Sequence, residues 1–502
     1  MALIILIMIK HLSVFIKQKR SPAYATIFLL SVITLLNALI ANRIGLSVDE
    51  AHYALYGSHL AWSYFDHPPL VGWLQALILP FSHSDFALRI WPMIFNIGSS
   101  WILYILSRDL FPHENRWFSF SCVATLQSAI IINILGLAWI PQTPFIFFGL
   151  ATLFFLYRSV QHERVPTFIL FGISMGLAAL AEYTAFFLAL VSVLYILSTK
   201  PRLFRHYPIW LTAFITMIFI SPILLWNIQH DWISFTYQHK HVLISEQWSW
   251  QSFLLSELVQ FFAYAPGIFI FACLGLLTSR KDWRSPPVRL LAIFILLLLL
   301  FFVYGSGYTF TLPHWTALAW IASIPLSLRY IYRYWQNTLV KVIVWISGLY
   351  SVLLILFIHI FVWPAWLNLP LAQQPLRDLY GWNTAAQMGK QWLLKEPHAN
   401  SQSPKLFVPN WTLASRIAWY AQYPVQIAAI QGVSQFTLWY GIPAQDSYGI
   451  LIIPYSWNTP PQIGTLPGQF KTCQFLQHLP IYVSQHLVNT FDFYYCTGFL
   501  QK

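Results

Sequence analysis

The chain has 502 residues, of which 58% are hydrophobic and only 9% are charged. Soluble domains carry roughly 25% charged residues, so this deficit excludes an ordinary soluble protein and predicts that most of the chain avoids water. The formal net charge is +12. The cations recur in short clusters between apolar runs, which the positive-inside rule explains without a nucleic-acid partner.

Apolar segments long enough to cross a bilayer, which takes about 20 residues, recur along the chain. The first apolar run, 1–9, lacks a small-residue cleavage site and is interpreted as an interfacial segment rather than a cleaved signal peptide. A later apolar stretch, 167–197, fits either one tilted span or a tight pair. The remaining predicted spans are 23–41, 87–107, 117–137, 143–157, 208–226, 252–277, 287–304, 315–331 and 340–363.

The charges of the loops decide between one span and a pair at 167–197. Lys10, Lys17, Lys19 and Arg20 precede the first span and place that side in the cytoplasm. With a single span at 167–197, every later cationic cluster would fall outside, whereas a pair places all of them inside. The pair is therefore favoured, with its turn near Glu182, and the total becomes about eleven transmembrane helices.

This topology divides the chain into a membrane module, 1–366, and an extracytoplasmic α/β domain, 367–502. The short apolar runs 405–408, 425–430 and 448–453 predict strands of that domain. The two long outer loops, 42–86 and 227–251, hold six of the 16 acids: Asp49, Glu50, Asp66, Asp85, Asp231 and Glu246. Cys473 and Cys496 lie in the C-terminal domain, where an extracytoplasmic location permits a disulfide, and two cysteines alone leave that pairing open.

The first outer loop carries the most informative motif, from Ser47-Val48-Asp49-Glu50 to Asp66-His67-Pro68-Pro69. Ser47 and Glu50 have the spacing of a capping box, so Glu50 has a purely structural alternative. Asp49 lies in the first turn of the same helix, where the helix dipole favours a carboxylate. Asp66 beside two prolines has the alternative of a turn residue.

The run DEAHYALYGSHLAWSYFDHPPLVGWL, followed by ALRIWP, resembles the GT-C superfamily of membrane glycosyltransferases. The resemblance is to the group related to protein O-mannosyltransferases and lipid A aminoarabinose transferases, and it recurs in SPILLWNIQHDWISF, LPHWTALAW and DLYGW. It implies a sugar donor carried on a polyprenyl phosphate. A phosphate leaves without a proton, so one carboxylate suffices, whereas glycoside hydrolysis usually needs two.

The resemblance implies that Asp49, the first acid of the motif, is the base that deprotonates the acceptor. Arg89 is a candidate for the donor phosphate and His314 for the donor groove, and each has an interfacial position as its alternative. The full set of candidate donor-binding or acceptor-binding residues is Glu50, Tyr53, Asp66, His67, Arg89, Gln142, Glu182 and His314. Asp66 and His239 match positions that hold a metal in the aminoarabinose transferases, so a divalent ion (Zn²⁺, Mg²⁺ or Mn²⁺) is a further expectation, with a solvated loop histidine as the alternative.

Two positions depart from the pattern of the relatives. Gln142 stands where they often have an acid, and Glu182 stands where they often have a lysine. An ionisable residue between apolar runs is a candidate for function, and His67 or Arg89 is its expected partner. The departures indicate either an altered substrate or a protein that binds without catalysing.

Three functions are therefore weighed. The first is an inverting glycosyltransferase of the bacterial inner membrane that moves a sugar to a lipid, glycan or protein acceptor on the outer face. The second is a catalytically altered family member that acts in binding or assembly. The third is a lipid transporter, which the absence of an internal repeat disfavours. The C-terminal domain is expected to cap the site or select the acceptor.

Overall fold

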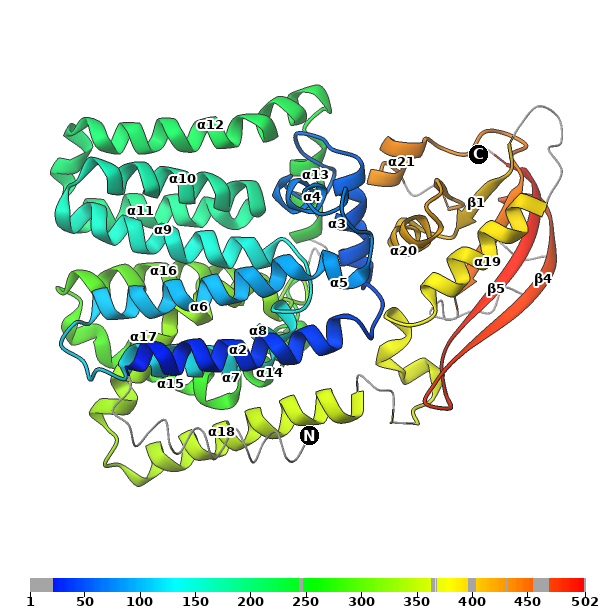
Figure 1. Cartoon of the computed structure of the whole chain (residues 1–502). Coiled ribbons are helices and arrows are strands. Elements are labelled where there is room, and N and C mark those ends of the chain that lie inside the picture. Colours follow the sequence, from blue (N-terminus) through cyan, green and yellow to red (C-terminus); the bar gives the residue numbers. More distant parts are fainter. Residues whose placement is uncertain are drawn as a thin grey trace.

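The computed structural model describes residues 21–242, 247–362, 366, 368–395, 403–429, 432–454 and 469–500. The segment 1–9 and the cations before the first predicted span lie outside the described residues. A bundle of helices occupies one part of the molecule, and a smaller part with a sheet sits against one end of it (Figure 1). We call this end of the bundle the sheet end and the opposite one the far end.

Each predicted span corresponds to a helix or to a pair of helices in the bundle. In chain order, the helices are α2 (Pro22–Ala41), α3 (Val48–Ser58), α4 (Leu70–Ala76), α5 (Asp85–Leu88), α6 (Ile90–Leu110), α7 (Phe118–Ser128), α8 (Ile130–Leu135), α9 (Gln142–His162), α10 (Val165–Ala181), η1 (Tyr183–Ala185), α11 (Phe186–Thr199), η2 (Pro201–Arg205), α12 (Tyr207–Gln229), α13 (Ile233–Val242), α14 (Trp250–Ala263), α15 (Pro266–Thr278), η3 (Ser279–Asp282), α16 (Pro286–Gly305), η4 (Pro313–Thr316), α17 (Ala317–Arg333), α18 (Thr338–Phe357) and η5 (Ile358–Val362). The stretch 167–197 is a pair of helices, α10 and α11, as the loop charges predicted. Glu182 is the residue between α10 and η1, at the turn.

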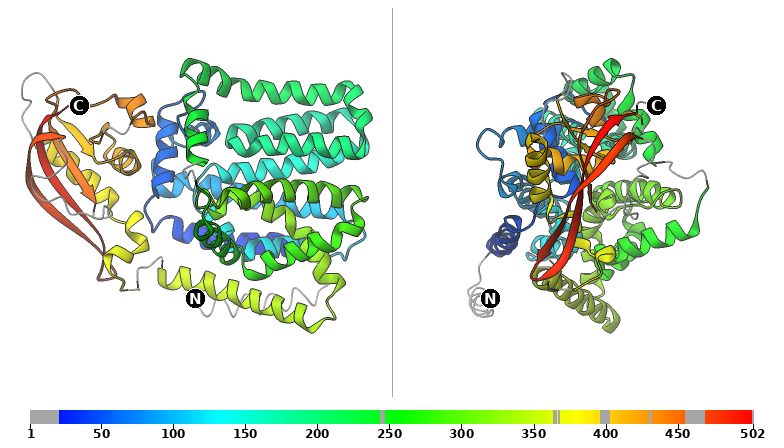
Figure 2. Two further views of the ribbon diagram at one scale, coloured as in Figure 1. Left: turned by 180° about the vertical axis from the view of Figure 1, so that it is seen from behind. Right: turned by 90° about the vertical axis from the view of Figure 1, so that its right-hand side faces the viewer.

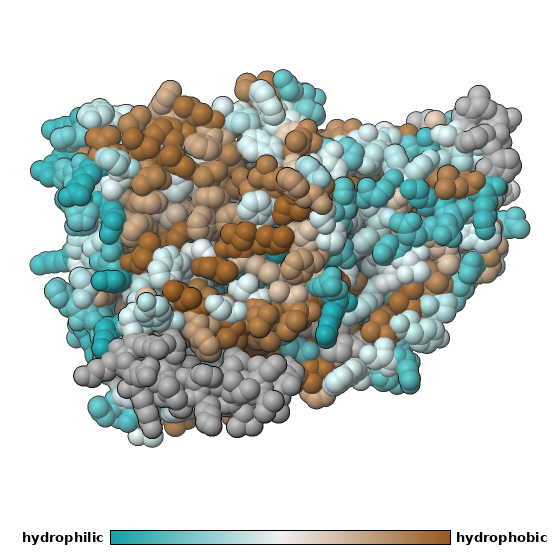
Figure 3. All heavy atoms as spheres, viewed as in Figure 1, coloured by the Kyte–Doolittle hydropathy of each residue, from teal (hydrophilic) through white to brown (hydrophobic). Residues whose placement is uncertain are grey.

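A broad hydrophobic band covers the middle of the bundle, and hydrophilic residues gather at its far end and over the sheet (Figure 3). Among the described residues, six helices are long and apolar enough to cross a membrane, or up to seven if the α14–α15 pair, bent by 104°, is one span. The apolar helices α10 and α11 are shorter. The chain is a multi-pass membrane protein, and the count of about eleven spans stays a prediction.

The C-terminal part is an α/β unit with a mixed five-stranded sheet. Its elements are η6 (Leu371–Gln373), η7 (Pro375–Asp378), α19 (Trp382–Lys395), β1 (Lys405–Val408), α20 (Trp411–Ala421), β2 (Val425–Ile427), α21 (Gln435–Tyr440), β3 (Gly449–Pro454), β4 (Phe470–Val483) and β5 (His486–Phe499). The strand order is β2-β1-β3-β5-β4, with β1 parallel to β2 and β3 and with β5 antiparallel to β3 and β4. The strands β1, β2 and β3 lie where the sequence predicted strands.

One face of this sheet packs against α19 and α20. Leu406 and Val408 of β1 point into that core, while Phe407 between them packs on the other face, as alternation along a strand requires. The views in Figures 1 and 2 agree that α20 and α21 lie between the sheet and α3. The α/β unit therefore meets the bundle through helices rather than through its sheet.

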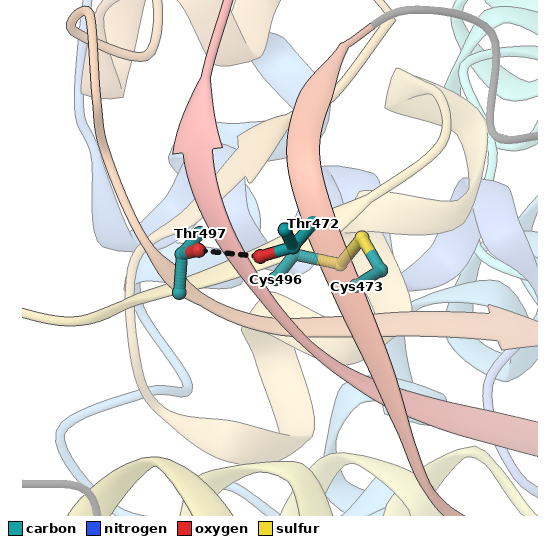
Figure 4. Close-up of a disulfide and its surroundings, with 4 residues drawn as sticks. All are labelled: Thr472, Cys473, Cys496 and Thr497. Carbon is teal, nitrogen blue, oxygen red and sulfur yellow. Dashed lines mark hydrogen bonds between the residues drawn. A yellow bond between two sulfur atoms is a disulfide. The ribbon is translucent and has the colours of Figure 1, made fainter. Parts of the chain in front are cut away.

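A disulfide joins the long hairpin formed by β4 and β5. Cys473 and Cys496 are directly opposed in the antiparallel register, and their sulfur atoms are bonded (Figure 4). Thr472 and Thr497, the next opposed pair, share a hydrogen bond of 2.7 Å between their hydroxyls. The pairing that the sequence left open is thus present in the structure.

The α/β unit is fixed to the bundle through Tyr420 of α20. Its hydroxyl accepts a hydrogen bond from the Leu46 amide at 2.7 Å and donates one to Asp85 at 2.8 Å. Gly45 adds a backbone bond to Leu379 at 3.1 Å. These contacts hold the segment that leads into α3 against the C-terminal unit.

We expect Tyr420→Phe to loosen this attachment, because it leaves the buried Leu46 amide and the half-buried Asp85 without their partner at a cost of about 1–3 kcal/mol. Limited proteolysis of the detergent-purified chain should then cut between the bundle and the α/β unit faster than in the wild type. Tyr423→Phe is the control, since the Tyr423 hydroxyl donates to the carbonyl of Pro404 in its own unit, at 3.4 Å. Equal cleavage rates for the two variants would refute the role of Tyr420.

Candidate functional site

Asp49 lies in the first turn of α3 at the sheet end of the bundle. The helix begins there because Ser47 and Glu50 form the predicted capping box, with both reciprocal hydrogen bonds present. The Asp49 side chain is accessible to solvent, although protein surrounds it on most sides. This desolvation raises the pKa of its carboxyl above the ordinary 3.8, against the opposing charges of His52 and His67. Within the described part of the chain, no group hydrogen-bonds to this carboxylate.

Arg89, a candidate for the donor phosphate, has its guanidinium directed into the protein. All five of its N–H groups donate within the protein: to both Glu50 oxygens at 2.7 and 2.8 Å and to the carbonyls of Ala41, Ile44 and Gly45 at 2.8 Å. The side chain is 1% exposed. Glu50 and Arg89 therefore form a buried ion pair that joins the end of α2 to the start of α3, and every N–H group of the Arg89 guanidinium already has a partner.

Asp66 lies near Asp49, and its carboxylate is surrounded by His52, His67 and Tyr56. Its Oδ1 accepts a hydrogen bond from Tyr56 and lies 3.3 Å from Nε2 of His52, and its Oδ2 lies 4.0 Å from Nε2 of His67. Burial alone would raise the pKa of Asp66, but His52, His67 and Tyr56 outweigh it and hold the pKa below its ordinary value. Asp66 is thus an ionised carboxylate throughout the physiological range.

Glu182 reaches the same cluster from the turn between α10 and η1. Its Oε2 accepts a hydrogen bond from Gln142 at 3.1 Å and lies 3.6 Å from Nδ1 of His67. Of the two partners expected for Glu182, the structure places His67 beside it. Burial raises the pKa of Glu182 above its ordinary value, while His67 opposes the shift. His67 therefore stands between two carboxylates, and the two departures from the family pattern contact each other.

Tyr53 and His314 complete the wall around this cluster. Tyr53, one turn after Asp49, is buried, and its ring meets that of His67 edge to face with centroids 5.7 Å apart. His314 lies in η4, where burial and the charge of His67 lower its pKa to about 4. It is therefore neutral at pH 7 and can accept or donate a hydrogen bond without carrying charge.

The predicted metal ligands Asp66 and His239 lie in different surroundings. His239 is exposed on α13, and the groups at Asp66 are His52, His67 and Tyr56. No group of three or more His, Cys, Asp or Glu side chains in the described ranges could hold a metal ion. The side chains of 240–242 lie outside the described set. The divalent ion stays a prediction.

The α/β unit contributes groups that sequence reasoning missed. The Ser415 hydroxyl lies 3.2 Å from Nδ1 of His52, so Ser415, His52 and Asp66 form a buried chain across the junction. Arg416 stacks on Trp382 at 3.4 Å and donates to Asp378, and its Nε has no partner in the described structure. Burial lowers the pKa of Arg416 to about 10, against the charges of Asp378 and Asp49. One signal existed for His52, which shares a helix face with Asp49 and Tyr56 at spacings of three and four.

These features define a multi-pass helical membrane protein with an accessible, unpaired carboxylate at one end of its bundle, roofed by an α/β unit. Such a carboxylate can take a proton from a hydroxyl brought beside it. His52, His67 and Asp66 lie near this carboxylate and act on its pKa.

Comparison with known proteins agrees with this class. Residues 66–226 match the family model described as dolichyl-phosphate-mannose-protein mannosyltransferase. The lipid A galacturonosyltransferase RgtD of Rhizobium johnstonii is 22% identical over 61% of this chain and 64% of its own length. The lipopolysaccharide core galacturonosyltransferase RgtB of the same organism is 26% identical over 37% of this chain and 38% of its own. The chain thus spans less than two thirds of the length of these curated relatives.

Among solved structures, ArnT from Cupriavidus metallidurans bound to undecaprenyl phosphate superimposes with a TM-score of 0.61 over 94% of this chain and 98% of that chain, at 14% identity. The chain therefore has the GT-C fold with a C-terminal sheet-containing unit. The resemblance predicted from the first loop is confirmed, since the relatives found by sequence and by structure are of the predicted class.

Proposed function

We propose that this protein is an inverting glycosyltransferase that moves a sugar from a polyprenyl phosphate to a hydroxyl acceptor. The observation that carries the proposal is the state of Asp49, a carboxylate at the sheet end that is solvent-accessible, has a raised pKa and has no hydrogen-bond partner among the described residues. Its raised pKa makes it a better base than an ordinary aspartate, because basicity increases with pKa.

In the proposed reaction, the acceptor oxygen attacks the anomeric carbon of the donor sugar. The bond from that carbon to the phosphate oxygen breaks, the phosphate leaves with the bonding electrons, and the acceptor proton passes to Asp49. A positioned base contributes typically 10²–10⁴-fold to such a rate. One displacement inverts the configuration, and no second carboxylic acid is needed because the phosphate leaves unprotonated.

The developing charge on the phosphate needs donors nearby. Arg89 is unavailable, so His67 takes this role in the proposal. Its side chain is 22% exposed, and its ring nitrogens lie 4.0 Å from Asp66 and 3.6 Å from Glu182. Tyr53 and His314 lie next to it as further hydrogen-bonding groups.

The acceptor is proposed to be a lipid, glycan or protein on the extracytoplasmic face, and lipid A or its core is the first class to test because the curated relatives act there by name. The proposed location is the bacterial inner membrane, with the sheet end outside. Three observations support this orientation: the cationic loops gather at the far end, the acids gather at the sheet end, and the α/β unit contains a disulfide.

The test is to incubate the purified full chain with a panel of undecaprenyl-phosphate sugars and lipid A, and to look for a glycosylated product by mass spectrometry. Product that Asp49→Asn abolishes and Asp446→Asn leaves intact supports the proposal. Asp446 pairs with Lys471 at 2.6 Å on the surface of the α/β unit, where both side chains are exposed. Full complementation of a deletion strain by Asp49→Asn would favour a binding or assembly role instead.

Ser415→Ala tests whether the α/β unit affects the activity and the pKa of Asp49. The substitution removes the partner of His52 Nδ1, so the His52–Asp66 contact loosens, and we expect kcat to fall about 3–10-fold, the value of one hydrogen bond of 0.5–1.5 kcal/mol. The acid limb of the pH profile should shift, because His52 and Asp66 both act on the pKa of Asp49. Ser447→Ala, a buried serine elsewhere in the same unit, is the control. An unchanged profile with a lower folded fraction would show a merely structural role.

A further inference from the structure

A second polar cavity lies at the far end of the bundle, away from the candidate site. Its volume is about 600 Å³, and its walls come from the turn after α6, from η3 with the residues that follow it, and from the end of α17. A neighbouring cavity of about 300 Å³ shares Glu114, Asp282, Arg329 and Arg333 with it. The proposed transfer reaction uses none of these residues.

The lining of the cavity carries an excess of positive charge. Lys281, Arg284, Arg329 and Arg333 contribute four cations, and Glu114 and Asp282 contribute two acids. Arg329 is fixed by Glu114 at 3.1 Å, by Asp282 at 3.8 Å and by the ring of Phe111 at 4.6 Å. One cation is therefore held in place at the back of the cavity.

The remaining cations are not neutralised in this way. Arg333, one turn after Arg329, reaches Asp282 only at 3.9 Å and is 54% exposed. Lys281 and Arg284 are exposed and form no ion pair within the described ranges. Three cations from two different elements thus face one hollow with a single acid between them, which suits a ligand with a compact negative charge.

The cavity also lies at the level of a membrane interface. Trp283 and Trp335, which are 45% and 38% exposed, flank its lining segments in sequence, and exposed tryptophans mark the headgroup region of a bilayer. The far end borders the hydrophobic band of the bundle (Figure 3). Basic pockets between transmembrane helices at this depth bind anionic lipid headgroups.

We propose that this cavity binds the phosphate of an anionic phospholipid headgroup, with Arg329 as its fixed anchor and Lys281, Arg284 and Arg333 closing around it. The lipid is a structural partner of the bundle and not a substrate of the transfer reaction. The inference goes beyond the proposed function and stands whether or not the chain transfers sugars.

The test titrates the full chain in detergent with dioctanoyl phosphatidylglycerol and counts bound lipid by native mass spectrometry. Parallel arms use dioctanoyl phosphatidylcholine and inorganic phosphate. We expect phosphatidylglycerol to bind more tightly than either. In Lys281→Gln/Arg284→Gln, its affinity should fall about 25-fold, about fivefold for each cation lost near an anionic headgroup.

The matched control is Arg164→Gln/Arg205→Gln, which removes two exposed cations of the far end that do not line the cavity. An equal loss of affinity in the control would overturn the proposal in favour of diffuse surface attraction. Inorganic phosphate binding as tightly as phosphatidylglycerol would overturn the lipid assignment in favour of a soluble anion. Equal binding of phosphatidylcholine would exclude a role for the cations.

Discussion

Replacing Asp49 by asparagine is expected to lower kcat by about 10²–10⁴-fold while the KM for the donor changes little. The amide keeps the size and the solvent exposure of the side chain but cannot take the acceptor proton. No hydrogen bond within the described structure depends on this carboxylate, so the fold should be unaffected. Initial rates of product formation at saturating donor measure the effect.

The pH profile separates loss of a base from loss of binding. Desolvation raises the pKa of Asp49 above 3.8, so wild-type kcat should fall as the pH drops through that raised pKa and the base becomes protonated. Asp66 has a lowered pKa and stays ionised over the same range, so it does not produce this limb. The residual activity of Asp49→Asn should lack the limb altogether.

A result against the prediction would be an Asp49→Asn enzyme with normal kcat and a raised donor KM. Asp49 would then bind the substrate, and the base would have to be sought elsewhere in the cluster. Glu182 would be the next residue to test, because its pKa is also raised by burial.

Features that depend on local sequence were predictable. The capping box of α3 requires only Ser47 and Glu50 three residues apart, and its two hydrogen bonds are present. The split of 167–197 into two helices followed from the sign of the flanking charges, which acts at the level of single loops. The GT-C likeness was recognisable because its main motif is one continuous stretch of the first loop, supported by shorter matches further along the chain.

Features that depend on distant contacts were not predictable. Glu50 and Arg89 are 39 positions apart in the sequence. The residues adjacent to each of them do not indicate that all N–H groups of the arginine donate within the protein. Ser415 is 363 positions from His52, in a part of the chain that the sequence linked to the site only as an expected cap. Contacts between residues so far apart in the sequence are determined by tertiary packing.

The long hairpin of β4 and β5 was missed for a different reason. The register shifts between Phe475 and Gln477 and again between Ile481 and Tyr482, and each irregularity resets the alternation by which a strand is recognised. Pro480 also argues against a central strand. It fits here because β4 is the edge strand of the sheet, where one side of the backbone needs no partner.

The second large effect is expected at Arg89. Arg89→Met should destabilise the protein by about 3–5 kcal/mol, because it leaves the Glu50 carboxylate buried without its counter-charge. It also leaves the carbonyls of Ala41, Ile44 and Gly45 without their donor. The measurement is the folded fraction of the detergent-purified chain on heating, followed by size-exclusion chromatography.

Two further variants identify the cause. Arg158→Met breaks an ion pair of similar length, 2.6 Å to Asp109, whose arginine is 42% exposed, and it should cost only about 0–1 kcal/mol. Adding Glu50→Gln to Arg89→Met should recover part of the lost stability, because the amide oxygen can still cap α3 while the unpaired charge is gone. Recovery in the double variant would show that the buried charge, and not the lost volume of arginine, causes the damage.

The same series decides between the two roles considered for Arg89. A phosphate-binding arginine would raise the donor KM without changing thermal stability, whereas a structural arginine lowers stability first and activity only through it. Arg89 links the end of α2 to the start of α3, and α3 carries Asp49, so its loss should release the proposed base from its fixed position. An Arg89→Met protein that unfolds at the wild-type temperature but no longer binds donor would return this residue to the active site.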